Sequence, residues 1–153
     1  MLELDAKVTN LGDARKDVER KMKELMGAPM VQTVRNATLL IQRSSRINAP
    51  VDTGRLRASI TPSVVSGVNE IQGIVGSNVK YAPYMELGTR PHWPPIAALE
   101  TWARSHGTSA FLVARAIARH GTKARRYLQR AFEENAGRVK VMVEQTIKRI
   151  SES

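Results

Sequence analysis

The triplet Asp52-Thr53-Gly54 is the part of this sequence that comes closest to a catalytic signature. In aspartic proteases the same triplet supplies one of two carboxyl groups that share a proton in a buried cleft. In this chain Pro50 precedes the triplet and an Arg-Leu-Arg sequence follows it, which would place two cations beside the carboxylate. The alternative is a turn that the Asp52 side chain closes and in which Gly54 adopts a positive φ. The flanking residues favour the turn and predict no protease activity.

Three histidines are the other side chains with ligand chemistry. A zinc-binding pair on a helix needs a spacing of four residues, whereas these histidines lie 14 residues apart, and neither cysteine nor a carboxylate cluster accompanies them. Two of them directly precede a glycine at expected helix ends, where capping is the ordinary role. The chain also lacks the phosphate-binding and nucleophile-elbow motifs, so we predict a non-enzymatic protein with no metal and no cofactor. The three histidines are His92, His106 and His120.

Positive charge is the strongest chemical feature of the chain. The formal net charge is +10, and residues 101–132 hold seven Lys or Arg side chains and no acidic residue. If residues 115–130 were helical, five of these cations would fall three or four residues apart along one face, which we call the basic stripe. Such a stripe predicts an anionic partner, either nucleic acid or an acidic protein surface, and a solvated basic face is the alternative. The basic stripe consists of Arg115, Arg119, Lys123, Arg126 and Arg130, and we expect Gly121 to divide it into two arms.

Helices are expected to occupy residues 1–48. Over Leu11–Met26 the apolar residues recur every three or four positions, which indicates an amphipathic helix. A second stretch, Met30 to about Ile47, has the same periodicity, and Pro50 ends it. The sequence Gly-Ala-Pro lies between the two stretches, so the region is either one kinked helix or a helical pair.

Residues 55–88 predict an antiparallel meander of about three to four strands. Three runs in this region, Leu56–Val65, Ile71–Val75 and Lys80–Leu87, carry strand-forming residues and are separated by short turns. Pro83 lies in the third run, which makes that run an edge strand or an irregular one.

Residues 94–152 are expected to be helical again. The order helices, strands, helices predicts one α+β domain over residues 1–153, with a small sheet flanked by a long N-terminal helix and by C-terminal helices. No apolar run is long enough to span a membrane, and the N-terminus lacks the pattern of a signal peptide, so we expect a cytoplasm-like compartment. The expected C-terminal helices are one opened by Pro94-Pro95 and closed by Gly107, one capped by Thr108 or Ser109 and closed by Gly121, and one running from Thr122 to about Ile150.

Three blocks of the sequence are similar, in order and spacing, to signature blocks of a known family. Residues 49–60 read APVDTGRLRASI and resemble the block pVDTGrLrxSi, and residues 79–91 read VKYAPYMELGTRP and resemble YAxyvExGT. Residues 124–132, ARRYLQRAF, resemble ArPFlxpAl more weakly, since Arg126 and Arg130 replace the two usual prolines. On these blocks the chain resembles the neck, head–tail joining and tail-completion proteins of tailed bacteriophages, with a helical insert between the second and third blocks.

The resemblance implies a structural virion protein at the head–tail interface, assembled in the host bacterial cytoplasm. The implied partners are further copies of the chain in a ring, six-fold with twelve-fold as the alternative, together with the neighbouring connector or stopper protein and the tail-terminator or tail-tube protein. Such a ring would let DNA pass, with transient non-specific contact to the packaged DNA, and would involve no membrane. An independent basic DNA-binding protein is the alternative function, which the net charge of +10 keeps open.

Seven residues within the shared blocks are expected to be structural. Pro50 and Gly54 would fix the exit from a long helix into the first strand, and Gly88 would allow a sharp turn after the third strand. Glu86 is spaced to form an ion pair with Arg90, within a subunit or between subunits, and an exposed pair contributes only about 0–1 kcal/mol. The expected motif residues are Pro50, Asp52, Thr53, Gly54, Glu86, Gly88 and Thr89.

Overall fold

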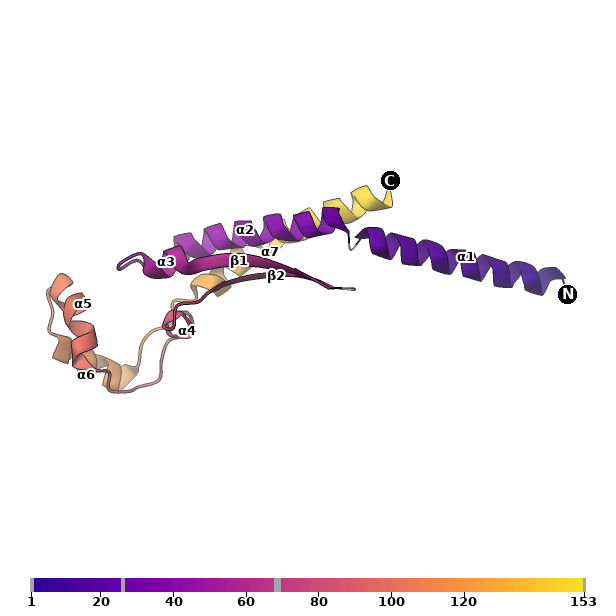
Figure 1. Ribbon diagram of the computed structural model, residues 1–153. Coiled ribbons are helices and arrows are strands. Elements are labelled where there is room, and N and C mark those ends of the chain that lie inside the picture. The colour runs from indigo at the N-terminus through magenta and orange to yellow at the C-terminus, as the bar shows by residue number, and fades with distance from the viewer. Residues whose placement is uncertain (1, 26, 68–69, 153) are drawn as a thin grey trace. The chain divides into compact units, whose positions relative to one another are not determined.

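The structure is a computed structural model that describes residues 2–25, 27–67 and 70–152, with the side chains of the first helix described from residue 12 onward. The fold is α+β, as predicted, and its elements follow one another in the order α1, α2, α3, β1, β2, α4, η1, α5, α6 and α7 (Figure 1). The chain forms two compact units. The first unit comprises Met1–Ser44, Thr61–Gly76 and Ala131–Ser153, and the second unit comprises Ser45–Ile60 and Ser77–Arg130.

The N-terminal region is a pair of helices, α1 (Leu2–Leu25) and α2 (Ala28–Asn48), rather than one continuous helix. Pro29 lies in the first turn of α2, where a missing backbone N–H removes no intrahelical hydrogen bond. α1 begins earlier than the amphipathic pattern predicted. Two members of its apolar stripe, Val18 and Met22, are 61% and 50% exposed.

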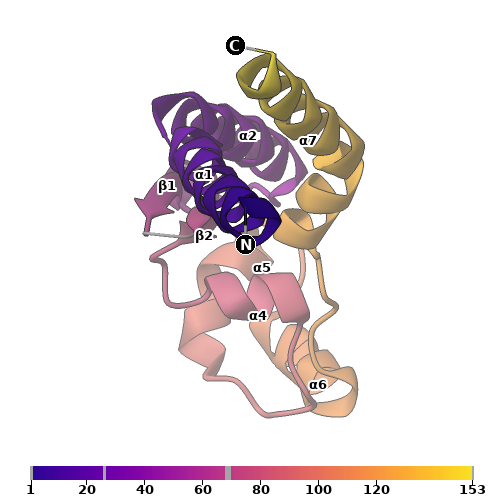
Figure 2. The same cartoon turned by 90° about the vertical axis from the view of Figure 1, so that its right-hand side faces the viewer.

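The first unit is built on α2 and α7 (Tyr127–Ser151), which run side by side in opposite directions (Figures 1 and 2). Thr33 of α2 and Thr146 of α7 are both buried, and their Oγ1 atoms lie 2.7 Å apart. Small side chains let two helices approach closely, which suits a chain with so few aromatic residues. The buried side chains of the first unit are Met30, Thr33, Ala37, Thr38, Ala131, Asn135 and Thr146.

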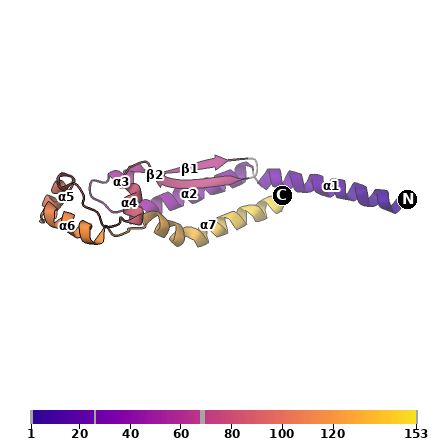
Figure 3. The same cartoon turned by 90° about the horizontal axis from the view of Figure 1, so that it is seen from below.

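The sheet is an antiparallel hairpin of two strands, β1 (Ile60–Ser66) and β2 (Ile71–Ser77), which runs along α2 (Figure 3). Gly73 marks the closest approach of β2 to α2. A Cβ at this position would overlap the Cγ2 of Thr38 and would lie 3.0 Å from the Cγ1 of Val34. The described part of the chain therefore holds two paired strands, and the prediction of three to four was wrong.

The first predicted strand, Leu56–Val65, begins as a helix. One helical turn, α3 (Arg55–Ser59), precedes β1, and the chain becomes extended only at Ile60. Leu56 and Ile60 are buried whereas Ala58 is exposed, which is a helical spacing of four rather than the alternation of a strand.

The third predicted strand, Lys80–Leu87, is a helix throughout its second part, α4 (Ala82–Leu87). Pro83 lies in the first turn of α4, where proline is compatible with a helix. This proline therefore marks the start of a helix and not an irregular strand. Tyr81 and Tyr84 are three residues apart and therefore project from neighbouring positions of one helical turn.

The second unit contains three helical segments between residues 96 and 120. They are the short 3₁₀ helix η1 (Ile96–Leu99), α5 (Glu100–Ser105) and α6 (Ala110–His120), which pack on one another. Ala103 and Ala114 are buried in this cluster. The helix expected before Gly107 is present as two segments, η1 and α5, and the helix expected before Gly121 is α6.

The last helix begins later than predicted. Thr122 does not start it; residues 122–126 form a connection, and α7 begins at Tyr127. Arg126 has a φ of 51°, a left-handed conformation that helices do not contain.

No helix within the described ranges is long and apolar enough to cross a bilayer.

Candidate functional site

The segment that follows α4 pairs with the segment that precedes α7, within the second unit. There the backbone N–H of Thr89 donates to the carbonyl of Thr122 at 3.1 Å, and the N–H of Thr122 donates to the carbonyl of Thr89 at 3.2 Å. The two hydroxyl oxygens also lie 3.0 Å apart. This isolated antiparallel bridge closes the segment that contains η1, α5 and α6.

Two glycines stand directly before the bridging threonines, and both need to be glycine. Gly88 has a φ of 72° and Gly121 a φ of 70°, in the left-handed region that L side chains rarely adopt. A Cβ on Gly88 would overlap the carbonyl oxygen of Thr122, and a Cβ on Gly121 would overlap that of Thr89. Gly88 follows the last residue of α4, whereas the turn expected at this position was to follow a third strand.

Glu86 joins α4 to the start of α7. One oxygen of its carboxylate accepts a hydrogen bond from the backbone N–H of Leu128 at 2.9 Å, and the other accepts from that of Gln129 at 3.0 Å. The backbone carbonyl of Glu86 accepts from the N–H of Arg126 at 3.1 Å. A carboxylate at a helix N-terminus satisfies donors that have no intrahelical partner and interacts favourably with the helix dipole. Glu86 is therefore a helix cap, and among the described residues it forms no ion pair with Arg90.

Tyr127, the first residue of α7, is fully buried beside this cap. Its hydroxyl has no hydrogen-bond partner among the described residues. Burial, together with the nearby negative charge of Glu86 and then Tyr81, raises the pKa of Tyr127 above its ordinary value. The burial of Tyr127 was not predicted, although this residue occupies the position of a Phe in the resembled block.

The Asp52-Thr53-Gly54 triplet forms a turn. Gly54 has a φ of 79°, and its carbonyl accepts from the N–H of Ala58 to begin α3. The side chain that closes the turn is that of Thr53, whose Oγ1 accepts from the N–H of Arg55 at 3.4 Å. Asp52 is exposed to solvent, unlike the buried carboxyl groups of an aspartic protease.

The histidines are dispersed over the second unit. The Nδ1 atom of His92 lies 2.9 Å from the carbonyl of Arg90, and His106 stacks on Trp102 with ring centroids 4.0 Å apart. His120 ends α6. The described residues contain no group of three or more His, Cys, Asp or Glu side chains that could hold a metal ion.

The basic stripe is spread over three parts of the second unit. Arg115 and Arg119 lie one turn apart on α6, Lys123 and Arg126 lie on the connection after Gly121, and Arg130 lies in the first turns of α7. All five side chains of the stripe are exposed, and none takes part in a salt bridge within the described ranges. α6 ends before Gly121, the residue at which a division was expected, and the left-handed conformation of Arg126 adds a second break before α7.

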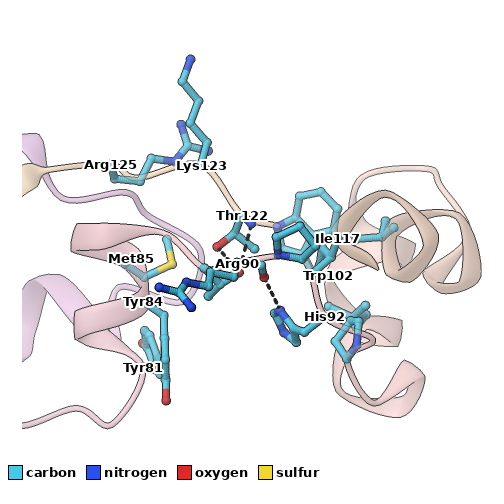
Figure 4. A pocket seen from close by; sticks show the side chains of 15 residues that line it. Tyr81, Tyr84, Met85, Arg90, His92, Trp102, Ile117, Thr122, Lys123 and Arg125 are labelled. Atoms are coloured by element: carbon cyan, nitrogen blue, oxygen red, sulfur yellow. Dashed lines mark hydrogen bonds between the residues drawn. The ribbon is translucent and has the colours of Figure 1, made fainter. Parts of the chain in front are cut away.

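An open cavity of about 750 Å³ lies in the second unit, beside the Thr89–Thr122 bridge (Figure 4). Sequence reasoning missed it. All seven aromatic residues of the chain fall between positions 81 and 132, and this clustering was the available signal. The lining residues are Tyr81, Tyr84, Met85, Thr89, Arg90, Pro91, His92, Pro94, Leu99, Trp102, Val113, Ile117, Thr122, Lys123 and Arg125.

Comparison with known protein families matches residues 3–88 to the family described as "Bacteriophage HK97-gp10, putative tail-component". This match spans more than half of the chain. The chain belongs to this family. No curated protein and no solved structure matched the chain. Membership of this phage tail-component family makes the protein a structural component of the virion and confirms the family assignment based on the first two sequence blocks.

Proposed function

We propose that this tail component completes the head–tail interface as one subunit of a ring through which packaged DNA passes. The observation that carries the proposal is the exposed, unpaired basic stripe in the second unit. Ring symmetry repeats every side chain around a central axis, so a modest stripe in each subunit becomes a belt of positive charge.

Such a belt suits a passage for DNA. A duplex carries about one negative charge per 1.7 Å of its axis, and exposed cations attract it through long-range electrostatics without reading its sequence. Weak attraction of this kind holds the DNA without stalling its ejection. An acidic ring of a neighbouring connector or tail protein is the other anionic surface that the basic stripe can face. The proposed ring is six-fold, with twelve-fold symmetry as the alternative.

The first experiment removes the protein from assembling phage. Particles that lack it should accumulate as separate DNA-filled heads and complete tails, seen by electron microscopy, because only the joining step is lost. Empty heads would instead assign the protein to the connector or to DNA packaging, and normal joined particles would refute a role at the interface.

The second experiment reverses charge at Arg126→Glu and Arg130→Glu together. Joining should fall at least about tenfold, measured as infectious titre, while the thermal unfolding of the isolated protein stays within a few degrees. The matched control carries Lys16→Glu and Lys23→Glu, two exposed cations on α1, and has the same net charge. If both variants reduce joining equally, total charge rather than the basic stripe is responsible, and the proposal fails.

An independent DNA-binding protein is the second candidate, and the net charge of +10 favours it. The two candidates differ in the response to salt. A protein that binds DNA on its own should show nanomolar to micromolar binding that weakens linearly in a plot of log affinity against log salt. We expect only weak binding by the isolated chain and incorporation into phage particles.

A further inference from the structure

The cavity in the second unit has two walls of different origin. One wall comes from α4 and its N-cap residue, and holds Tyr81, Tyr84 and Met85. The other wall comes from α5 and α6, and holds Trp102 and Ile117 (Figure 4). The Thr89–Thr122 bridge holds the two walls together. At about 750 Å³ the cavity lies within the roughly 300–1,000 Å³ range that is typical of small-ligand sites.

The inner surface of the cavity is mainly apolar. Met85, Leu99, Val113 and Ile117 contribute aliphatic groups, and the indole of Trp102 closes one side. Tyr84 and Trp102 are 60% and 40% exposed, which leaves apolar ring surface in contact with water. Such a surface favours an occupant with a large aliphatic or aromatic side chain.

The charged groups of the cavity are all of one sign. Arg90, Lys123 and Arg125 are exposed lining residues, and none of the fifteen lining residues is acidic. The side chain of Arg90 extends toward Tyr84 and Met85 (Figure 4). An occupant that carries carboxylates beside its apolar group would pair with these cations as it enters.

A nucleobase fits this cavity less well than a peptide does. Proteins that bind single-stranded nucleic acid offer open aromatic faces on which bases stack. Here one face of Trp102 is already covered by His106, whose ring is nearly parallel at a centroid distance of 4.0 Å. The remaining lining is largely aliphatic, which matches a Leu or Phe side chain better than the flat face of a base.

We propose that this cavity is a docking site for an acidic peptide segment of another protein, which inserts a large apolar side chain between α4 and the α5–α6 pair and places its carboxylates against Arg90, Lys123 and Arg125. That the segment belongs to a neighbouring tail or connector protein rests on the proposed function. The recognition chemistry does not depend on the proposed function, and it can be tested on the isolated chain.

Trp102 provides the signal for the test. The chain has two tryptophans, and Trp93 packs edge-on against Phe111 outside the lining of the cavity. Trp93→Phe keeps an aromatic ring there and leaves Trp102 as the sole tryptophan. The probe is the acetylated and amidated peptide Glu-Asp-Leu-Phe-Asp-Glu, titrated while the emission of Trp102 is recorded. We expect a saturable shift of the emission that weakens as salt is added.

Three peptides serve as controls. Gln-Asn-Leu-Phe-Asn-Gln lacks the charge, Glu-Asp-Ala-Ala-Asp-Glu lacks the apolar side chains, and Lys-Arg-Leu-Phe-Arg-Lys reverses the charge. Each should bind the unmodified cavity at least about tenfold more weakly than the acidic Leu-Phe peptide. The double variant Arg90→Glu with Lys123→Glu should exchange the preference, so that the basic peptide binds more tightly than the acidic one.

The control for charge is Arg104→Glu, which reverses one exposed cation on α5 that does not line the cavity, and it should change the affinity by less than about twofold. Equal loss of affinity in this variant and in the double variant would overturn the proposal. So would a response of Trp102 to oligothymidine but not to the acidic peptide, which would assign the cavity to nucleic acid. A change of Trp102 emission with protein concentration alone would assign it to a second copy of the chain. All of these measurements are independent of head–tail joining.

Discussion

One carboxylate oxygen of Glu86 lies 2.9 Å from the backbone nitrogen of Leu128, 42 residues later in the chain. The contact joins the last turn of α4 to the first turn of α7, and the second oxygen of the carboxylate accepts in the same way from Gln129. A short helix thus supplies the N-terminal cap of a long one. The loop that contains the bridge and the cavity begins and ends within a few residues of this cap.

We expect Glu86→Ala to lower the free energy of unfolding by about 2 kcal/mol, because two charge-assisted hydrogen bonds and a favourable interaction with the helix dipole are lost. Glu86→Gln should cost about half as much, since an amide oxygen can still accept one of the two bonds. Urea unfolding measures both. Glu144→Ala, which removes only an exposed pair with Lys140, is the control and should cost less than about 0.5 kcal/mol. Equal losses at both positions would contradict the cap.

Tyr127→Phe should leave the protein as stable as before or stabilise it by up to about 1 kcal/mol at neutral pH. The substitution keeps the buried ring and removes a hydroxyl that has no partner among the described residues. An unsatisfied buried polar group costs about 1–3 kcal/mol, so its removal is favourable. A marked loss of stability in urea unfolding would show that the hydroxyl is bonded in solution.

The raised pKa of Tyr127 predicts a loss of stability at high pH. Burial and the charge of Glu86 favour the protonated phenol in the folded chain, so the unfolded chain loses this proton first as the pH rises through about 10. The folded state then binds more protons than the unfolded state, and stability falls until the folded pKa is reached. Absorbance at 295 nm should show a tyrosine ionisation above about pH 10, and Tyr127→Phe should abolish that step.

Gly121→Ala should destabilise the protein more than Gly107→Ala does. Gly107 also has a positive φ, 64°, but a Cβ there would meet open space, so it reports backbone strain alone, about 1–2 kcal/mol. At Gly121 a Cβ would in addition overlap the backbone of Thr89. Thermal unfolding compares the two variants. Similar values would show that the bridge between Thr89 and Thr122 opens at little cost.

The helices of this chain could largely be predicted from its sequence. The apolar spacing in α2 and the glycines after α5 and α6 are local signals, and local signals decide where helices begin and end. The strands were predicted less well, because short apolar runs fit both the helical and the strand periodicity. Leu56 and Ile60 illustrate this. Their separation of four residues fits one turn of a helix as well as two repeats of a strand, and the helix forms here, directly after Gly54.

The candidate site was harder to predict from the sequence than the fold. The basic stripe is a composition signal and was visible, but its division by Arg126 depends on a backbone angle that no periodicity encodes. Glu86 was expected to pair with the nearest cation in sequence, whereas it caps α7 because the bridge brings residues 42 positions apart together. The cavity likewise depends on contacts between distant segments, which a single sequence does not specify.

The bridge between Thr89 and Thr122 also has a consequence for how proteins of this kind diverge. The segment from Arg90 to Gly121 lies between Thr89 and Thr122, which are hydrogen-bonded to each other. The distance between its two ends is therefore set by the bridge and not by its length. Closing a longer loop costs only about 0.6 kcal/mol for each doubling. We therefore expect the segment to tolerate changes in length without rearrangement of α4 and α7. The family match ends at Gly88, two residues before the first residue of this segment.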